Sequence, residues 1–404
     1  MRVNIRPLGR NLMGPLVLAL AATGAFALPG SAVAAQGSSA VSGYVYLDGN
    51  TAGANTIAAY TRARGGSLTP TLGSPFAAGG EGLGKGLGSQ GAIQTADNGR
   101  FVLAVDAGSN QISVLQVNPD GTLTRVPGSP FSSNGVEPVS IAVHGNLVYV
   151  ANDGNATESA NYTGFFLTNF GRLIPLPNST VNAPGAANDL GDVLFNSDGT
   201  NLVGTEVASS RIDSFHVDFL GYLHAAPGSP FTGQGLGAFG SAFRPSSPFP
   251  FPNSPNQLFV SNPHNVGTDV GTVSAFDVAG NGELSSIGAS PFADLQNAPC
   301  WVAITPDGQF LFAINTGSGT VSRFSIDQRG DLTLLGSTLV NDEGGVGGTD
   351  PTITPDGQNL YINETAAHGV AEMKIEGGSL TELPGSPVAL PAGDTAAAGV
   401  ASID

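Results

Sequence analysis

A seven-fold repeat constrains the fold of this chain more than any other feature of its sequence. Each copy contains Gly, any residue and Leu, and most copies continue, five residues after the Leu, with a tetrad like Gly-Ser-Pro-Phe. A repeat of about 50 residues built from short strands and turns is the signature of a propeller blade. The chain is therefore predicted to be an all-β, seven-bladed propeller. The repeated leucines, 55, 50, 50, 61, 48 and 48 residues apart, are Leu68, Leu123, Leu173, Leu223, Leu284, Leu332 and Leu380.

Each repeat contains four strand-like segments, which one copy illustrates. An apolar segment at Trp301–Thr305 precedes the dipeptide Asp307-Gly308, and an aromatic and β-branched segment follows at Phe310–Ile314. The segment Val321–Ile326 alternates, and the Gly-x-Leu turn opens a short fourth one. Asp-Gly supplies the positive φ of tight hairpins, and alternation with period two is typical of strands. The pattern predicts antiparallel blades of four strands.

The two ends of the chain are predicted to share one blade. After Leu380 there is room for a single further strand, near Gly399–Ile403. Three N-terminal segments supply the other strands of that blade, and such a closure leaves no exposed sheet edge. The predicted blades cover residues 91–126, 139–176, 190–226, 238–287, 300–335, 350–383, and 398–404 together with 43–71. A Gly-rich segment at 77–91 and a Pro-rich insertion at 244–256 interrupt the repeats.

The first 35 residues have the organisation of a secretory signal. Three arginines precede an apolar run at Leu12–Leu28, and the small residues Ala32–Ala35 follow. This arrangement predicts a signal peptide at 1–35 that is removed, and a propeller domain at 36–404. The mature protein is then secreted, or lies in the periplasm or cell envelope, without an integral membrane span. A retained anchor is the alternative, because the apolar run is marginal in length for a span.

Composition narrows the partners. The chain has 14 Lys and Arg against 31 Asp and Glu, a net charge of −17. Such a surface repels nucleic acid and anionic lipid, so neither is an expected partner. Cys300 is the only cysteine. No intrachain disulfide can form, and stability has to come from a large buried core. We expect a monomer.

Two of the repeats resemble a known family. Residues 304–315 (ITPDGQFLFAIN) and 353–363 (ITPDGQNLYIN) look like the repeats of lactonase-type seven-bladed propellers. That family includes bacterial 6-phosphogluconolactonases and fungal carboxymuconate cyclases, and YVTN-repeat propellers are related to it. The resemblance implies the same fold. It also implies one of two activities: that of a lactonase, which is a carboxylic-ester hydrolase, or that of a cycloisomerase-like enzyme. The expected substrate is a small lactone or sugar-acid lactone bound at the channel mouth.

The sequence departs from the family where inner strands begin. Enzymes of the family often carry Pro-His or Pro-Arg-His there, facing the central channel. The matching stretches here are 137–139 (Glu-Pro-Val), 298–300 (Ala-Pro-Cys) and 350–352 (Asp-Pro-Thr), without His or Arg. The alternative function is therefore a non-catalytic, secreted propeller that binds a ligand, a cation or a cell-envelope partner.

Oxygen-bearing side chains are expected around the channel mouth. In a four-stranded blade, the second-to-third and fourth-to-first connections share one face. Carboxylates gathered there would raise each other's pKa or hold a cation such as Ca²⁺, which prefers oxygen ligands. The alternative is that they are solvated turn residues. The carboxylates are Asp48, Asp106, Asp153, Glu206, Glu364, Glu137, Asp189, Asp350 and Asp394, of which Asp106, Asp189, Asp350 and Asp394 are the metal candidates.

The catalytic candidates are five residues of the same face. Glu206 and Glu364 are potential bases, and His264 and His368 fall in loops where a general base or phosphate contact is conceivable. Arg211 begins a third strand and is the best-placed arginine for an anionic substrate. Each has a structural alternative: the histidines as exposed loop residues, and Arg211 in an ion pair with an acidic neighbour.

Four further residues are candidate ligand contacts. Trp301 is placed to stack on a sugar or lactone ring. Asn297 and Asn315 add neutral oxygens, and Lys85 brings positive charge to an acidic rim. Lys85 lies in the Gly-rich segment, which is either a lid over the channel mouth or loop filler. The ligand expected from these residues is a lactone or another carbohydrate-derived small molecule.

Overall fold

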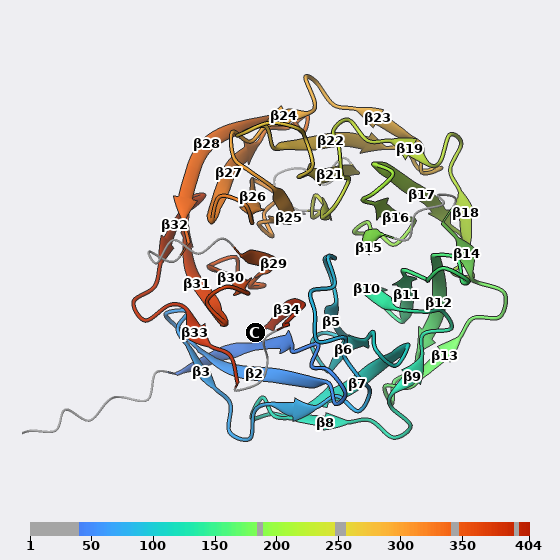
Figure 1. Cartoon of the computed structure of the whole chain (residues 1–404), viewed down its shortest axis with the longest axis vertical. Coiled ribbons are helices and arrows are strands. Elements are labelled where there is room, and N and C mark those ends of the chain that lie inside the picture. Colours follow the sequence, from blue (N-terminus) through green and yellow to red (C-terminus); the bar gives the residue numbers. More distant parts are fainter. Residues whose placement is uncertain (1–39, 184–188, 247–255, 341–346, 392–395) are drawn as a thin grey trace, which may run out of the picture. The chain divides into compact units, whose positions relative to one another are not determined.

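The computed structural model describes residues 40–183, 189–246, 256–340, 347–391 and 396–404. These residues form seven antiparallel sheets arranged in a ring (Figure 1). The ranges contain no helix, and hence none long and apolar enough to cross a membrane. The predicted all-β, seven-bladed propeller is confirmed. The predicted signal peptide lies outside the described residues.

The strands of each blade are given from the channel outwards. Blade 1 contains β5 (Ile93–Ala96), β6 (Phe101–Asp106), β7 (Gln111–Val117), β8 (Leu123–Arg125) and β9 (Phe131–Ser132). Blade 2 contains β10 (Pro138–His144), β11 (Leu147–Asn152), β12 (Asn161–Leu167), β13 (Leu173–Pro175) and β14 (Val181–Asn182). Blade 3 contains β15 (Leu190–Phe195), β16 (Asn201–Glu206), β17 (Arg211–Val217), β18 (Leu223–Ala225) and β19 (Phe231–Thr232). Blade 4 contains β20 (Ser241–Phe243), β21 (Gln257–Asn262), β22 (Thr272–Val278), β23 (Leu284–Ser286) and β24 (Phe292–Ala293).

The remaining blades complete the ring. Blade 5 contains β25 (Pro299–Ile304), β26 (Phe310–Asn315), β27 (Thr320–Ile326) and β28 (Leu332–Leu339). Blade 6 contains β29 (Gly348–Ile353), β30 (Asn359–Glu364), β31 (Gly369–Glu376), β32 (Ser379–Glu382) and β33 (Val388–Ala389). Blade 7 contains β34 (Gly399–Ile403), β1 (Val41–Asp48), β2 (Thr56–Ala63), β3 (Leu68–Pro70) and β4 (Phe76–Ala77).

Blade 7 joins the two ends of the chain. Strand β34 pairs antiparallel with β1, with Asp48 opposite Gly399 and Tyr44 opposite Ile403. One C-terminal strand and the N-terminal strands β1 to β4 therefore form the closing blade, with β3 and β4 both paired to β2 at the outer position. The predicted closure of the ring by both ends of the chain is confirmed. Because the pairing is non-covalent, the ring depends on side-chain packing and polar contacts at this seam.

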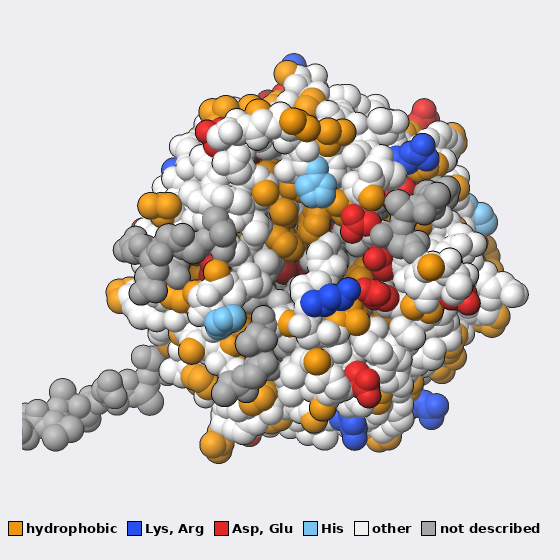
Figure 2. Space-filling view, viewed as in Figure 1, with side chains coloured by type: hydrophobic (Ala, Val, Ile, Leu, Met, Phe, Trp, Pro, Cys, Tyr) orange, Lys and Arg blue, Asp and Glu red, His pale blue; other side chains and the backbone are white. Residues whose placement is uncertain are grey.

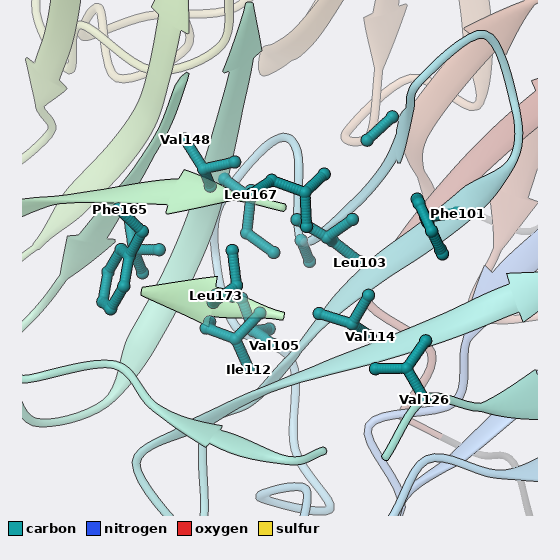
Figure 3. Packing of buried hydrophobic residues seen from close by; sticks show 14 of the residues in the cluster. Phe101, Leu103, Val105, Ile112, Val114, Val126, Val148, Phe165, Leu167 and Leu173 are labelled. Atoms are coloured by element: carbon teal, nitrogen blue, oxygen red, sulfur yellow. The ribbon is translucent and has the colours of Figure 1, made fainter. Parts of the chain in front are cut away.

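The hydrophobic core is divided among the interfaces between neighbouring blades. Seven clusters of buried side chains each join one blade to the next. Between blades 1 and 2, for example, Phe101 and Leu103 pack with Phe165 and Leu173 (Figure 3). Each sheet is thus covered by a neighbouring blade on both of its faces. Because both faces are buried, the sequences of the strands are largely apolar.

The Gly-x-Leu repeat has two structural causes. All seven leucines are buried, with at most 9% of each side chain exposed. All seven glycines have positive φ, from +77° to +95°, a conformation that is strained for residues with a Cβ. A Cβ at these positions would also meet the preceding blade; at Gly121 it would lie 2.1 Å from the Tyr44 ring. The turn between third and fourth strands therefore requires glycine.

The Gly-Ser-Pro-Phe tetrad interrupts the outer strand. In five blades the Ser-Pro bond is cis, and two short strands on either side of the tetrad pair with the same third strand. The serine hydroxyl accepts a hydrogen bond from a third-strand N–H that the gap leaves open, as Ser129 does from Val114 at 2.9 Å. Ser179 has the same role without the proline. In blade 5, where the copy is one residue short, β28 runs unbroken through Ser337.

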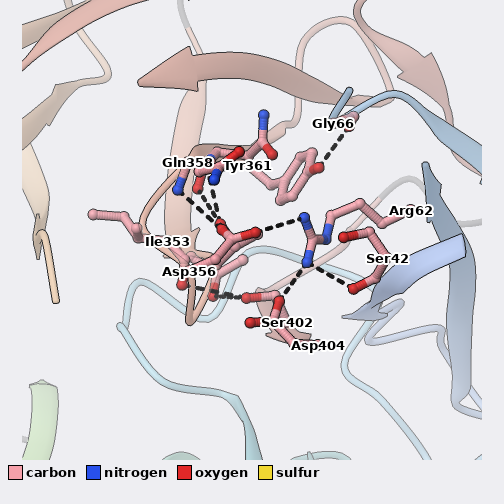
Figure 4. A network of polar contacts seen from close by, with 12 residues as sticks. Ser42, Arg62, Gly66, Ile353, Asp356, Gln358, Tyr361, Ser402 and Asp404 are labelled. Atoms are coloured by element: carbon pink, nitrogen blue, oxygen red, sulfur yellow. Dashed lines mark hydrogen bonds and ion pairs between the residues drawn. The ribbon is translucent and has the colours of Figure 1, made fainter. Parts of the chain in front are cut away.

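A buried arginine anchors the closing blade. Arg62 of β2 is only 1% exposed, and its guanidinium bonds to the Ser42 carbonyl at 2.9 Å and to the Asp404 carboxylate. Its other terminal nitrogen lies 3.3 Å from Asp356 in the β29–β30 turn of blade 6 (Figure 4). One side chain thus connects the N-terminal strands, the C-terminus and the neighbouring blade.

Loss of this guanidinium should open the seam. We expect Arg62→Met to lower the free energy of unfolding by about 2–3 kcal/mol, because Asp404 and Asp356 both lose their cation. The loss is no larger because water still reaches both carboxylates. Lys374→Met, which removes a solvent-exposed pair with Glu376, should cost less than about 1 kcal/mol. Urea denaturation of both variants checks this, and equal losses would contradict the role of Arg62.

Candidate functional site

Residues 85–91, here called the axial segment, occupy the centre of the ring. Figure 1 shows the chain just before β5 reaching into the middle of the propeller. The Gln90 N–H donates to Gly191 O at 2.7 Å, and its side-chain amide donates to Ser241 O at 2.8 Å. The Trp301 indole N–H donates to Ser89 O at 2.8 Å. The Gly-rich stretch is therefore bonded into the channel by the inner strands of blades 3, 4 and 5, and it is not loose filler.

Three carboxylates gather beside the axial segment, and we call them the acidic rim: Glu137, Asp153 and Asp189. Lys85 lies 4.0 Å from the Glu137 carboxylate. Burial raises the pKa of Asp153 to about 6, and the charges of Asp189 and Glu137 add to the rise. A hydrogen bond from the Leu190 N–H at 2.7 Å acts in the opposite direction and lowers this pKa. Figure 2 shows acidic side chains along one side of a central hollow with an apolar floor, and a basic side chain beside them.

His264 is close enough to the acidic rim to act on it electrostatically. Burial raises the pKa of Asp189, and the field of His264 opposes that rise. His264 is exposed, and a Cβ at Gly237 would lie 2.6 Å from its ring. A base with a pKa near neutral, a histidine and an ammonium group thus lie at one side of the mouth, which suits proton transfer.

A pocket of about 410 Å³ lies on the other side of the axial segment. Trp301, Leu87 and Ala397 form apolar walls, and Thr349 and Thr365 add hydroxyl groups. Its volume is in the usual range of small-molecule sites. Trp301 is only 7% exposed and packs edge-to-face on Phe239, 5.0 Å between ring centroids. It can therefore offer a ligand part of one wall of the pocket, and its N–H is already engaged by Ser89.

A second cavity of about 200 Å³ lies along the axis, and we call it the axial cavity. Asp192 of β15 and Asp350 of β29 line it, and each is 3% exposed. Burial raises the pKa of Asp192 to about 7, against hydrogen bonds from Ser241 and Ser140. Burial raises the pKa of Asp350 well above its usual range, and Asp192 adds to the rise.

The last residues of the seven second strands form a ring of buried polar side chains inside the blades. Asp106 accepts from Ser113 at 2.6 Å, and Asn315 donates to the hydroxyls of Thr320 and Ser322. These side chains were expected around the mouth, but the structure buries them inside the blades, where Asp106 and Asn315 bond to hydroxyls of their own third strands. The seven are Asp48, Asp106, Asn152, Glu206, Asn262, Asn315 and Glu364, all at most 2% exposed.

Two catalytic candidates are among these buried residues. Glu206 accepts a hydrogen bond from Ser209. The pKa of Asp213 is raised first by the burial of Asp213 and second by the charge of Glu206. Burial, and then Glu382, raises the pKa of Glu364 to about 8. Neither carboxylate opens to the mouth, so both are separated from any substrate held there.

The other candidates are spread over the face. His368 is exposed in the β30–β31 turn. Arg211 is exposed and lies opposite Glu206 in the strand register, and its charge lowers the pKa of Asp213. Asn297 pairs with Asp269 through its side-chain oxygen and nitrogen. Asp394 and Asn188 lie outside the described residues. Within those residues no three of His, Cys, Asp and Glu gather as a metal-binding group.

Sequence reasoning did not single out Asp192 or Gln90. The available signal was the polar pair Gly191-Asp192 inside an otherwise apolar inner strand. The register of β15 shifts between Leu190 and Asp192, and that of β29 between Gly348 and Pro351. Such bulges re-aim side chains, and here they bring Asp192 and Asp350 to the axis.

Comparisons with known proteins agree with this architecture. Residues 235–353 match the family model described as lactonase, 7-bladed beta-propeller. A Bacteroides fragilis protein described as a candidate 6-phosphogluconolactonase is 18% identical, with TM-score 0.67 over 90% of this chain and 98% of that one. The periplasmic gluconolactonase of Pseudomonas aeruginosa is 16% identical, with TM-score 0.65 over 90% and 99%. No protein of curated function matches. The predicted resemblance to lactonase-type propellers is confirmed, and at these identities the solved structures show the fold alone.

The buried carboxyls make stability depend on pH. Burial raises the pKa of Glu364 to about 8 and that of Glu372 to about 7. The folded protein therefore binds more protons than the unfolded chain between about pH 4.5 and 8, and its stability falls as pH rises through that range. We expect a lower free energy of unfolding at pH 8.5 than at pH 5.5, by on the order of 3 kcal/mol for Glu364 alone.

Substitution by glutamine isolates the contribution of Glu364. Glu364→Gln resembles the protonated acid, so this variant should match the wild type at pH 5.5 and exceed it at pH 8.5. Glu376→Gln, at an exposed position, is the matched control and should follow the wild type throughout. Denaturant unfolding at both pH values measures the difference, and identical wild-type and Glu364→Gln curves would contradict the assignment.

Proposed function

We propose that this protein hydrolyses a small, neutral lactone at the mouth of the propeller. The observation that supports the proposal is the acidic rim, where the raised pKa of Asp153 coincides with Lys85 and His264. Lactone hydrolysis needs an activated water and a group that stabilises the oxyanion. The likeness to lactonase-type propellers supports the same reaction class.

The proposed mechanism assigns one step to each group. Asp153 in its ionised form takes a proton from water, whose oxygen attacks the ring carbonyl carbon. The Lys85 ammonium stabilises the negative charge that develops on the carbonyl oxygen. The ring C–O bond then breaks, and His264, beside Asp189, protonates the leaving oxygen. The product is the open-chain hydroxy acid, and no cofactor takes part.

The charge of the mouth favours a neutral substrate over a phosphorylated one. Three carboxylates form the rim, and Lys85, the cation beside them, already faces Glu137. The positive charge of Arg211 lies near the buried Asp213, whose pKa it lowers, and is therefore partly balanced by that carboxyl group. The candidate 6-phosphogluconolactonase from Bacteroides fragilis is named for a phosphorylated lactone, but a phosphate dianion would be repelled here. The apolar pocket beside Trp301 suits an uncharged ring.

The proposal includes the compartment. The N-terminal signal predicts export, and the Pseudomonas aeruginosa gluconolactonase with the same fold is described as periplasmic. We propose that this protein acts as a monomer in the periplasm, in the cell envelope or outside the cell, without a nucleic-acid partner.

A non-catalytic binding protein is the second candidate. Its support is the axial segment, which occupies the centre of the ring through bonds to Gly191, Ser241 and Trp301. It also explains why the inner strands begin without the histidine or arginine of related enzymes. In that case the pocket beside Trp301 holds a ligand without turnover.

Replacing the proposed base tests the mechanism. We expect Asp153→Asn to lower kcat for a neutral lactone by about 10²–10⁴-fold, the usual contribution of a positioned base. Wild-type activity should fall below about pH 6 as Asp153 takes up a proton. Proton release from glucono-δ-lactone and γ-butyrolactone is measured against Asp120→Asn, a substitution in an exposed turn. Absence of turnover on every lactone would support the binding protein instead.

Substrate charge is tested separately. We expect kcat/KM for glucono-δ-lactone to exceed that for 6-phosphogluconolactone by at least about tenfold, and the ratio to decrease with added salt because screening weakens the repulsion. Asp189→Asn removes one negative charge from the rim and should bring the ratio of the two kcat/KM values closer to one. Preference for the phosphorylated lactone would contradict the charge argument while leaving lactonase activity intact.

A further inference from the structure

The axial cavity is a second site, separate from the acidic rim. It is lined from five blades, by strands β5, β15, β20, β29 and β34, and by the end of the axial segment. Its polar lining includes Gln94, Thr352 and Ser402 besides the two carboxylates. A polar cavity of about 200 Å³ has room for an ion with several water molecules.

The two carboxylates of the cavity are held differently. Asp192 is fixed by the Ser241 N–H at 3.1 Å, the Ser241 hydroxyl at 2.8 Å and the Ser140 hydroxyl at 3.2 Å. Asp350 accepts one hydrogen bond, from the Gly91 N–H to Oδ2 at 2.9 Å. Its other oxygen has no donor among the described residues, although the side chain is 97% buried and lines the cavity.

Gly91 brings the two carboxylates together. Its N–H bonds to Asp350, and a Cβ on it would lie 3.6 Å from Asp192 Oδ1 and 3.0 Å from the Ser140 hydroxyl. Gly91 also has φ of +80°, which glycine adopts without strain. Blades 3 and 6, on either side of the axis, thus present carboxylates to the same residue of the axial segment.

Among the described residues, no basic side chain lines the axial cavity. The buried Arg62 is bonded at the closing seam, and Lys85 faces the rim. Two buried carboxylates without a counter-charge are costly, because desolvation is not repaid by attraction. A cation between them would supply that attraction, and oxygen ligands with water in the remaining positions suit Mg²⁺ or Ca²⁺.

We propose that the axial cavity binds one hydrated divalent cation, Mg²⁺ or Ca²⁺, between Asp192 and Asp350. The ion would link β15 of blade 3 to β29 of blade 6 and, through Gly91, hold the axial segment in the channel. It would therefore stabilise the ring from its centre. The proposal assigns Asp350 the metal role expected from sequence, with Asp192 as its partner in place of Asp106, Asp189 and Asp394.

Calorimetric titration of the chelator-treated protein with CaCl₂ and with MgCl₂ tests the proposal. We expect one site per chain with a Kd of about 10⁻⁴–10⁻³ M, as in extracellular calcium modules. At about 10 mM cation the melting temperature should rise by several degrees, since the ion binds the folded state alone. Asp350→Asn and Asp192→Asn should each weaken binding at least tenfold, and both should fold, because neutralising a buried carboxyl removes an unpaired charge.

The rim serves as the matched control. The double variant Asp153→Asn with Asp189→Asn should keep its cation affinity within about twofold of the wild type. Terbium provides a positional readout because Trp301 is the only tryptophan and bonds to Ser89, two residues from Gly91. Trp301→Phe should abolish tryptophan-sensitised terbium emission and leave calorimetric Ca²⁺ binding in place.

Three results would overturn the proposal. One is no binding of either cation at about 10 mM, which would mean that a shared proton alone neutralises the pair. Another is unchanged affinity in both Asp350→Asn and Asp192→Asn. The third is loss of binding in the rim double variant alone, which would place the cation at the mouth. None of these results depends on lactonase activity, so the proposed function is tested independently.

Discussion

The structure depends on the mutual covering of its blades. Each sheet carries apolar side chains on both faces, and only a neighbouring blade can cover them. Seven clusters meet this need in a closed circle, the last of them joining Tyr361 of blade 6 to Val45 and Leu47 of blade 7. The hydrophobic gain of every interface is retained only if the ring stays shut. Pairing of β1 with β34 and the buried Arg62 therefore affect all seven blades.

Closing the ring creates an axis that has to be filled. Seven inner strands surround a central channel, and the axial segment lies in it (Figure 1). Its main-chain N–H groups donate to the Gly191 carbonyl and the Asp350 carboxylate, and the Ser89 carbonyl accepts from the Trp301 indole. The Gln90 side chain donates to the Ser241 carbonyl and accepts from the Val302 N–H. The pocket beside Trp301 and the axial cavity are the spaces left beside and along this segment. Both candidate sites thus follow from how the centre is packed.

Acidic side chains are concentrated at three places in the described part of the propeller. Carboxylates occur at the rim, in the axial cavity and at the ends of the second strands, while most described arginines and lysines lie elsewhere. Burial raises the pKa of Asp153, Asp192 and Glu364, so these groups exchange protons in the range where enzymes operate. The same burial makes them costly to stability at high pH. The proposed preference for an uncharged substrate rests on the three carboxylates of the acidic rim.

The sequence by itself determined the number of blades, their four-strand plan and the closure by both ends, because these depend on local rules repeated seven times. A turn with positive φ needs glycine, as at Gly121, and a leucine two residues later must be buried, as Leu123 is. Only the tertiary structure decided which acids face the axis. Their position at strand ends predicted Asp106, Glu206 and Glu364 near the mouth, but all three side chains are buried inside the blades. Asp106 and Glu206 accept hydrogen bonds from the hydroxyls of Ser113 and Ser209 there. Asp192 reaches the channel through a bulge, and residues 85–91 fill the centre through bonds to partners 35 to 259 residues away. Such contacts follow from the geometry of the closed ring, which no local pattern encodes.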